Sequence, residues 1–387
     1  MTVGFLTQYY HGLGHSQRIK FIAERVAEKE KVVIMDQLFK PPLSYTVPHI
    51  AFLEKYDPKS VSNMFKFIQD EALINLRLKS FIKTIDTYKV KTLVCEGFPF
   101  CRHQFAHEYT RYLEECKKRD IKIIFSIRDF PYDEPHEQSL QDWVLYTQNM
   151  YVKYYAEALL VHGDKNILPL FTDRRRQANS VQVIKEISPK IIYTGYVCDD
   201  TLPPHNQKNN NIYVSTGLNK NEGMLLFKNL LEVANDFPDY NFIMTVANKF
   251  LKTKNKRKNN VYMVDYIPNL REKLIDCAAY ISYGGYNATV EILKSSIPSI
   301  IIPRQDGRKM EQFVRAYTFE PYNFYKVVNS NDIKSLKSVL ETVLKEKPNK
   351  FNFNIDGTNR SADVIRQIHN GQFKRRRNNL EENSSSK

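Results

Sequence analysis

Two glycine-containing segments of the chain carry residues that can bind or transform a ligand. In the first, Gly12-Leu13-Gly14-His15 follows a short apolar stretch and precedes a stretch with helical spacing. The glycines let the backbone approach a ligand closely, and an imidazole at the start of a helix can accept a proton near neutral pH. The third glycine of a dinucleotide-binding motif is missing. The segment therefore favours proton transfer beside a ligand over a plain capping turn with a surface histidine.

The second segment begins with Ala278–Glu291, in which the turn Gly284-Gly285 separates a buried strand from a short helix. It continues through a second buried strand at Ser299–Pro303 to a loop that ends in Glu311-Gln312. Such a turn leaves backbone N–H groups and the positive end of the helix dipole facing an anion. Glu291, one turn further on, and the pair Glu311-Gln312 can hydrogen-bond hydroxyl groups beside that anion. The implied ligand is a phosphate joined to a sugar.

Polar residues also follow other predicted strands. Arg128 can hold an anion, and either Asp129 or Asp164 can orient His15 or contact an acceptor hydroxyl group. Ser215-Thr216-Gly217 offers hydroxyl and N–H groups that suit a diphosphate. For each of these the alternative is ordinary capping at the end of a strand. Tyr266-Ile267-Pro268 can contact a base or act as a hydrophobic clamp.

The elements that must position these residues alternate between strand and helix. This alternation predicts two doubly wound, Rossmann-like parallel sheets facing a cleft, since ligands of such sheets lie beyond the carboxyl ends of the strands. The linker Asp199–Asn211 separates a domain at 1–200 from one at 201–355, followed by a helix within 356–373 and a polar tail at 374–387. The expected strands are Val3–Gln8, Lys31–Asp36, Thr92–Glu96, Ile121–Ile127, Ala158–Val161, Ile191–Thr194, Ile212–Ser215, Phe242–Val246 and Val261–Val264, and the expected helices are Ser16–Ala27, Val61–Tyr88, His103–Lys118, Leu140–Tyr155, Glu222–Asn235, Leu270–Cys277, Asp332–Leu344 and Ala362–Gln372.

The composition excludes several classes of protein. A chain of 387 residues with 42% hydrophobic residues can bury two cores, and it has no apolar run of membrane-spanning length and no export signal. Its five cysteines are scattered without a C-x-x-C pair, which favours a reducing cytoplasm and no zinc site. The net charge of +14 reflects either codon bias or an anionic partner. Basic runs occur at Arg174–Arg176, Lys249–Lys258 and Lys374–Arg377; each is a polyanion-binding segment or a solvated loop.

Taken in order, these motifs resemble the glycosyltransferases of GT-B fold, specifically the family 28-like group and a predicted branch related to the peptidoglycan N-acetylglucosaminyltransferase. The resemblance rests on the following residues: Gly12–Arg18, Ile127–Asp129, Val161–Asp164, Tyr193–Val197, Tyr283–Glu291, Ile302–Arg304 and Glu311-Gln312. The first domain would then bind the acceptor and the second a nucleotide sugar, usually a UDP-sugar. Arg304 and the inserted Asp306-Gly307-Arg308 depart from the peptidoglycan enzyme.

The resemblance also implies roles for individual residues. His15 would be the base, helped by Asp129 or Asp164, and Glu291 would hold the ribose. The diphosphate would lie at Ser215–Gly217 and Gly284–Tyr286, and the donor sugar at Glu311-Gln312. Transfer would invert the anomeric centre without a metal or a cofactor besides the UDP-sugar. The other residues expected to bind substrate are Gly12, Gly14, Arg18, Arg128, Ile267, Asn287 and Arg304.

The sequence is compatible with three classes of function: a glycosyltransferase, a UDP-sugar hydrolase and a nucleic-acid-binding protein. The predicted enzyme moves a hexose or N-acetylhexosamine to a hydroxyl group of a glycan, a lipid-linked saccharide or a modified DNA base. It would be cytoplasmic, with peripheral contact to the inner face of the membrane as a further expectation. A UDP-sugar hydrolase of nonulosonic acid synthesis shares the Gly-x-Gly-His-x-x-Arg pattern. A non-catalytic nucleic-acid-binding protein would account for the basic runs.

Overall fold

The computed structural model of the chain describes residues 1–9, 13–56, 61, 63–129, 140–167, 183–199, 208–215, 222–245, 260–264, 267, 270–304, 311–329, 332–350, 352 and 354–373. Apart from short 3-10 and π-helical turns, the elements within these residues are β1 (Thr2–Thr7), α1 (Gly14–Ala27), β2 (Lys31–Asp36), β3 (His49–Ala51), α2 (Met64–Gln69), α3 (Glu71–Thr87), β4 (Val90–Glu96), α4 (Ala106–Lys118), β5 (Lys122–Arg128), α5 (Leu140–Thr147), β6 (Ala156–His162), β7 (Ile191–Tyr193), β8 (Asn211–Ser215), α6 (Glu222–Val233), β9 (Asn241–Thr245), β10 (Val261–Val264), α8 (Leu270–Leu274), β11 (Ala279–Ser282), α9 (Tyr286–Ser295), β12 (Ser299–Ile301), α10 (Glu311–Phe319), β13 (Lys326–Val327), α11 (Leu336–Lys345) and α12 (Gly357–His369).

The chain forms two compact units. One contains Met1–Asp199 together with the segment that begins at Asn354, and the other contains Asp200–Phe353. The first unit has a seven-stranded sheet of order β3-β2-β1-β4-β5-β6-β7, and the second has a six-stranded sheet of order β10-β9-β8-β11-β12-β13. Every pair of neighbouring strands in the two sheets is parallel. These sheets confirm the predicted α/β class.

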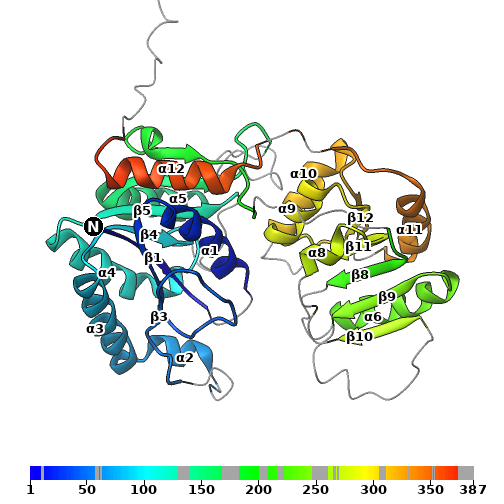
Figure 1. The fold of residues 1–387 in the computed structure, drawn as a ribbon, viewed down its shortest axis with the longest axis horizontal. Helices are drawn as coiled ribbons and strands as arrows, with labels where there is room; N and C mark the ends of the chain where they lie inside the picture. The colour runs from blue at the N-terminus through cyan, green and yellow to red at the C-terminus, as the bar shows by residue number, and fades with distance from the viewer. Residues whose placement is uncertain are drawn as a thin grey trace, which may run out of the picture. The chain divides into compact units, whose positions relative to one another are not determined.

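Helices cover both faces of the first sheet, because its strands are apolar on both sides (Figure 1). One face packs against α3, α4 and α5 through Phe81, Tyr112 and Trp143. The other face packs against α1 and α12, whose buried side chains recur at helical spacing. The last helix of the described chain therefore belongs to the core of the first unit.

The second sheet is covered in the same way. One face packs against α6 and α11 through Leu226, Leu230 and Leu340. Figure 1 shows α8, α9 and α10 on the other side of that sheet. The carboxyl ends of β8, β11 and β12, and the turn that leads into α9, thus lie at one edge of this unit.

Several predicted boundaries were wrong. The single helix expected at Val61–Tyr88 is two helices, because Asp70 takes an extended conformation and its side chain caps α3 by accepting from Leu73 N–H. The final helix begins at Gly357 rather than Ala362. Strands β3 and β13 and helix α10 were not predicted, and the pair Glu311-Gln312 begins α10 instead of ending a loop.

Within the described residues, no helix has the length and apolarity needed to cross a membrane. The five cysteines are buried and reduced. No group of three or more metal-ligating side chains comes together in the same residues.

Candidate functional site

His15 lies at the start of α1, beyond the carboxyl end of β1. Its Nδ1 atom is 2.9 Å from Oε1 of Glu96, the last residue of β4. Strands β1 and β4 are neighbours in the sheet, which is why residues 81 positions apart meet. The Glu96 side chain is 1% exposed and that of His15 is 17% exposed. The His15 ring is therefore held by a buried carboxylate and is itself partly exposed to solvent.

Arg18, one turn along α1, holds the same carboxylate. It is 1% exposed and donates from Nη2 to Oε1 of Glu96. Burial alone raises the pKa of the Glu96 carboxyl, but the charge of Arg18 and then the hydrogen bond with His15 outweigh it, and the pKa falls to about 2. Glu96 is therefore a carboxylate at neutral pH.

The ionised Glu96 determines which nitrogen of His15 carries the proton. A carboxylate can only accept hydrogen bonds, so His15 Nδ1 donates to it and Nε2 keeps its lone pair. Burial and the positive charges of Arg102 and Arg128 lower the pKa of His15 to about 3, against the smaller opposing effect of Glu96. The imidazole is therefore neutral at physiological pH and presents Nε2 as a proton acceptor.

A second buried histidine is connected to the same carboxylate. Ser126 on β5 donates to Oε2 of Glu96 over 3.1 Å and lies 2.7 Å from Nε2 of His162. On its other side, His162 Nδ1 lies 2.9 Å from the hydroxyl oxygen of Thr194. The chain of hydrogen bonds joins the carboxyl ends of β4, β5 and β6 to the residue after β7. It restricts Glu96 to one position.

The structure places the other predicted residues of this unit as follows. Asp129 is fully buried beside Gly163, and Asp164 accepts a hydrogen bond from the N–H of Asn166 over 2.8 Å. The carboxylate that contacts His15 is Glu96, which the sequence argument missed although it ends a predicted strand. Catalytic roles for Asp129 and Asp164 stay predictions.

We expect the buried histidines to make the first unit sensitive to acid. The pKa of His162 is lowered from 6.5 to about 3, mainly by burial and also by the charge of Arg18. Burial is also the largest cause of the lowered pKa of His15. Both histidines bind a proton less tightly in the folded state than in the unfolded state. Their contribution to the free energy of unfolding is therefore complete above pH 6.5 and is lost as the pH falls toward 3. Each histidine can lower the free energy of unfolding by up to about 1.4 kcal/mol per pH unit in this range.

This loss can be measured by urea unfolding between pH 7.5 and 4.5. The chain has one tryptophan, Trp143, which is buried in the first unit, so its fluorescence reports that unit alone. The control is His107→Gln, because the His107 side chain is 68% exposed and should leave the slope unchanged. A free energy of unfolding that stays constant over this range would contradict the expectation.

In the second unit, the turn before α9 requires its first glycine. Gly284 has φ +71°, and a Cβ atom there would lie 2.7 Å from Cγ2 of Ile301. Gly285 has no atom within 4 Å of the position of a Cβ, and no side chain caps α9. The turn therefore leaves open space beside Gly285, at the start of α9, where the helix dipole favours an anion.

Arg315 contacts this turn through the backbone of Gly284, and the sequence did not predict a role for it. It is fully buried, donates from Nη1 to the carbonyl oxygen of Gly284 over 3.0 Å, and its guanidinium lies 5.7 Å from the ring centre of Tyr286. The sequence signal that could have identified Arg315 is its position four residues after Glu311, because that spacing places both side chains on one face of a helix. Their charged atoms are 3.9 Å apart.

Other predicted residues lie near the same edge. Glu291 forms an ion pair with Arg271 (Oε2 to Nε 3.1 Å), with both side chains partly exposed. The guanidinium of Arg304 lies 4.5 Å from the ring centre of Tyr283, and its backbone N–H donates to Gln312 over 3.4 Å. The remaining residues are Ser215, hydrogen-bonded to the hydroxyl of Tyr280, Ile267, which is buried, and Asn287, which is half-buried.

Some predictions concern residues outside those described. Gly12, Thr216 and Gly217 fall there, as do the basic runs Arg174–Arg176, Lys249–Lys258 and Lys374–Arg377. Gly14 is described and is the first residue of α1, and Arg128 ends β5. Substrate contacts by all of these residues stay predictions.

Comparison with known proteins places the fold. The glycosyltransferase family 28 C-terminal domain matches residues 228–368. This range includes the Gly284-Gly285 turn, α9 and α10. A curated relative is UDP-N-acetylglucosamine--N-acetylmuramyl-(pentapeptide) pyrophosphoryl-undecaprenol N-acetylglucosamine transferase of Thermosipho melanesiensis, 27% identical over 199 residues, covering 49% of this chain. The chain spans 58% of the length of that relative.

Solved structures resemble the whole described fold. Acinetobacter baumannii MurG has a TM-score of 0.55 at 11% identity, over 95% of this chain and 100% of that one. The glycotransferase of kitacinnamycin has a TM-score of 0.58 at 10% identity, over 96% and 95%. The glycosyltransferase VinC, solved with DTDP, has a TM-score of 0.54 at 11% identity, over 96% of each chain. These likenesses confirm the predicted two-sheet arrangement.

Proposed function

We propose that this chain, which has the GT-B fold and matches the family 28 C-terminal domain over residues 228–368, is a glycosyltransferase that transfers a hexose or N-acetylhexosamine from a UDP-sugar to an acceptor hydroxyl group with inversion. The observation that carries the proposal is the family 28 match over the residues that build the open turn before α9. The unit Asp200–Phe353 binds the donor and the other unit binds the acceptor.

In this mechanism His15 acts as the base. Its Nε2 takes the proton of the acceptor hydroxyl while the acceptor oxygen forms a bond to the anomeric carbon. The bond between that carbon and the β-phosphate oxygen breaks, and its electron pair leaves with UDP. The products are the glycosylated acceptor, UDP and a proton, which His15 returns to water. Glu96 stabilises the imidazolium through its hydrogen bond to Nδ1.

The donor would be held around α9. The positive end of the α9 dipole faces the diphosphate and stabilises the charge that develops on the leaving UDP. Glu291 binds the ribose, Ser215 contributes to the diphosphate site, and Glu311 with Gln312 binds the donor sugar. Arg315 acts indirectly, because its contact with the carbonyl of Gly284 keeps the turn in place.

The surroundings of His15 support an anionic acceptor. Arg102 and Arg128 both lower the pKa of His15, which means that positive charge surrounds the proposed base. An acceptor that carries phosphate would be attracted to this position. DNA, a lipid-linked saccharide and an anionic glycan all satisfy this requirement. A lipid-linked acceptor would bring the cytoplasmic enzyme into peripheral contact with the inner face of the membrane.

The proposal is tested by screening UDP-sugars against a panel of acceptors. UDP release and the mass of the glycosylated product are measured together, with phosphate-bearing glycans, polyprenyl-linked saccharides and duplex DNA as acceptors. Acceptor-dependent UDP release with a matching product supports transfer. Free sugar and UDP formed without an acceptor would instead identify a hydrolase, and nucleic-acid binding without any UDP release would refute both activities.

Replacing Glu291 with alanine should weaken UDP binding by about 10- to 100-fold, the usual loss when a hydrogen bond to a charged group is removed. Affinity is measured by calorimetry with UDP and with uracil, which lacks the ribose. The affinity for uracil should be unaffected. The control is Arg271→Gln, which removes the ion pair but keeps the Glu291 carboxylate. Equal losses in the two variants would show that the ion pair, and not a ribose contact, matters.

A further inference from the structure

The second unit contains a pocket on the side away from the turn before α9. Its volume is about 530 Å³, within the range of small-molecule sites. Cys277, which lines it, precedes β11, and Pro298 precedes β12, so the pocket lies at the amino ends of these parallel strands. The proposed donor site lies at their carboxyl ends. Helix α9, about 15 Å long, separates the two, because Ser295 at its last position also lines the pocket.

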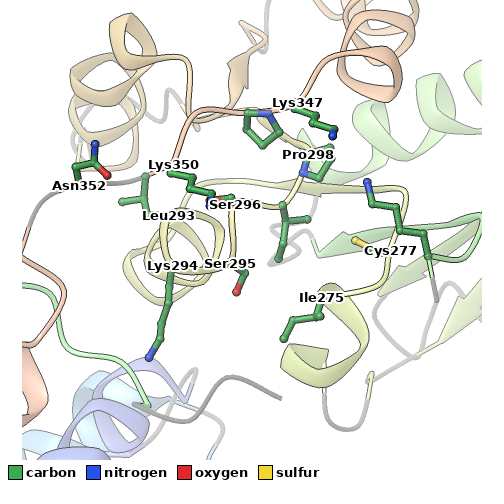
Figure 2. A pocket seen from close by; sticks show the side chains of 13 residues that line it. Ile275, Cys277, Leu293, Lys294, Ser295, Ser296, Pro298, Lys347, Lys350 and Asn352 are labelled. Atoms are coloured by element: carbon green, nitrogen blue, oxygen red, sulfur yellow. The ribbon is translucent and has the colours of Figure 1, made fainter. Parts of the chain in front are cut away.

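The side chains around the pocket come from several separate segments of this unit (Figure 2). These are the stretch before β8, the stretch before β11, the end of α9 with the turn to β12, and the stretch after α11. The full lining is Lys208, Ile275, Cys277, Leu293, Lys294, Ser295, Ser296, Ile297, Pro298, Lys347, Pro348, Lys350 and Asn352. Residues far apart in sequence thus form one concave surface.

The charge of this surface has one sign. Four lysines line the pocket, Lys208, Lys294, Lys347 and Lys350, and no aspartate or glutamate lines it among the described residues. Two acidic residues adjoin the lining in sequence without being part of it: Asp276 is 6% exposed, and Glu346 forms an ion pair of 2.9 Å with Lys326. A concave surface of low dielectric concentrates the field of such charges, so the pocket attracts anions.

The rest of the lining supplies hydroxyl groups and an apolar wall. Ser295 and Ser296 add hydroxyl groups at the end of α9, and Leu293, Ile297 and Cys277 are buried beneath. Burial raises the pKa of the Cys277 thiol to about 12, so the sulfur is a neutral part of the wall. The ligand that fits is an anion with an organic body, because a bare ion would fill only a small part of about 530 Å³.

We propose that this pocket binds the phosphate ester of a small molecule, at a site distinct from that of the nucleotide sugar. Lysine ammonium groups bind phosphate as point charges, the serine hydroxyls donate hydrogen bonds to its oxygens, and the carbon skeleton packs against the half-buried rings of Pro298 and Pro348. The phosphate ester can be a soluble sugar phosphate or the headgroup of a phospholipid. The chemistry of the contacts is the same for both.

The soluble source is tested by calorimetry with fructose 1,6-bisphosphate on the full chain, in the presence of saturating UDP. UDP occupies the donor site, so binding that remains belongs to another site. We expect one saturable site, weakened about tenfold or more by the double variant Lys347→Gln/Lys350→Gln. The control, Lys228→Gln/Lys334→Gln, removes the same charge from exposed positions outside the pocket and should bind as the unchanged chain does.

The lipid source is tested by flotation with phosphatidylcholine vesicles that contain or lack phosphatidic acid, using the same variants. Binding to the bisphosphate or to the phosphatidic acid vesicles that is lost only in the pocket variant supports the proposal and identifies the source. Absence of binding in both assays, equal losses in the two double variants, or displacement by UDP would each overturn it. Failure here leaves the transfer activity untouched, because that activity is measured separately by UDP release.

Discussion

Replacing His15 with alanine is expected to slow sugar transfer by about 10²- to 10⁴-fold, the usual contribution of a positioned general base. The affinity for UDP should stay within about twofold, because His15 and the proposed donor site belong to different units. The loss should appear in kcat rather than in the KM for the donor, because the proton is transferred only as the new bond forms. Initial rates of UDP release and calorimetry with UDP measure these two quantities.

The dependence of kcat on pH separates this role from a structural one. Because the pKa of His15 is lowered to about 3, transfer by the unchanged chain should show no acidic inflection near pH 6.5. The control variant is His107→Ala, whose side chain is exposed on α4 and which should keep full activity. Retained turnover in His15→Ala would remove His15 from the mechanism. A parallel loss of UDP binding would indicate a folding defect.

The second large effect concerns stability. Glu108→Ala should lower the free energy of unfolding of the first unit by about 3–5 kcal/mol, the range found when one partner of a buried ion pair is removed. Arg77 is fully buried and donates to both carboxylate oxygens of Glu108, over 2.8 and 2.7 Å, joining α3 to α4. Without Glu108 the guanidinium keeps its bond to the Ile68 carbonyl but loses its counter-charge.

Urea unfolding followed by Trp143 fluorescence measures this effect in the unit that contains the pair. The same two helices carry a matched exposed pair, Glu71 and Arg111, at 2.6 Å. Glu71→Ala should change the stability little, because that pair is screened by water. Similar losses for the two variants would show that burial does not set the strength of the Arg77–Glu108 pair.

The parts of the fold that could be predicted are those with a local signal. Buried runs such as Ile121–Ile127 are strands because parallel sheets bury both faces, and the Gly284-Gly285 turn is marked by its own residues. The break at Asp70 was also local: an aspartate at a helix start accepts from the third residue beyond it, but apolar residues on either side suggested one helix. Strand β3 has three residues, too few to show a period.

The parts that could not be predicted depend on which elements become neighbours. Glu96 could be assigned to the end of a strand, but its role follows from the adjacency of β1 and β4, which local patterns do not specify. Arg315 is charged and reads as a surface residue of a helix, yet it is fully buried against the carbonyl of Gly284. Buried charges of this kind become visible only when their partners are in place.

The return of α12 to the first unit has a consequence for synthesis on the ribosome. The core around α1 is incomplete until Ile365 and Ile368 have left the exit tunnel, whereas Asp200–Phe353 is one continuous stretch. The second unit therefore has all its residues first, although the first unit begins earlier, in contrast to the usual N-to-C order of domain folding. Until translation passes α12, the part of α1 that packs against Ile365 and Ile368 lacks its cover.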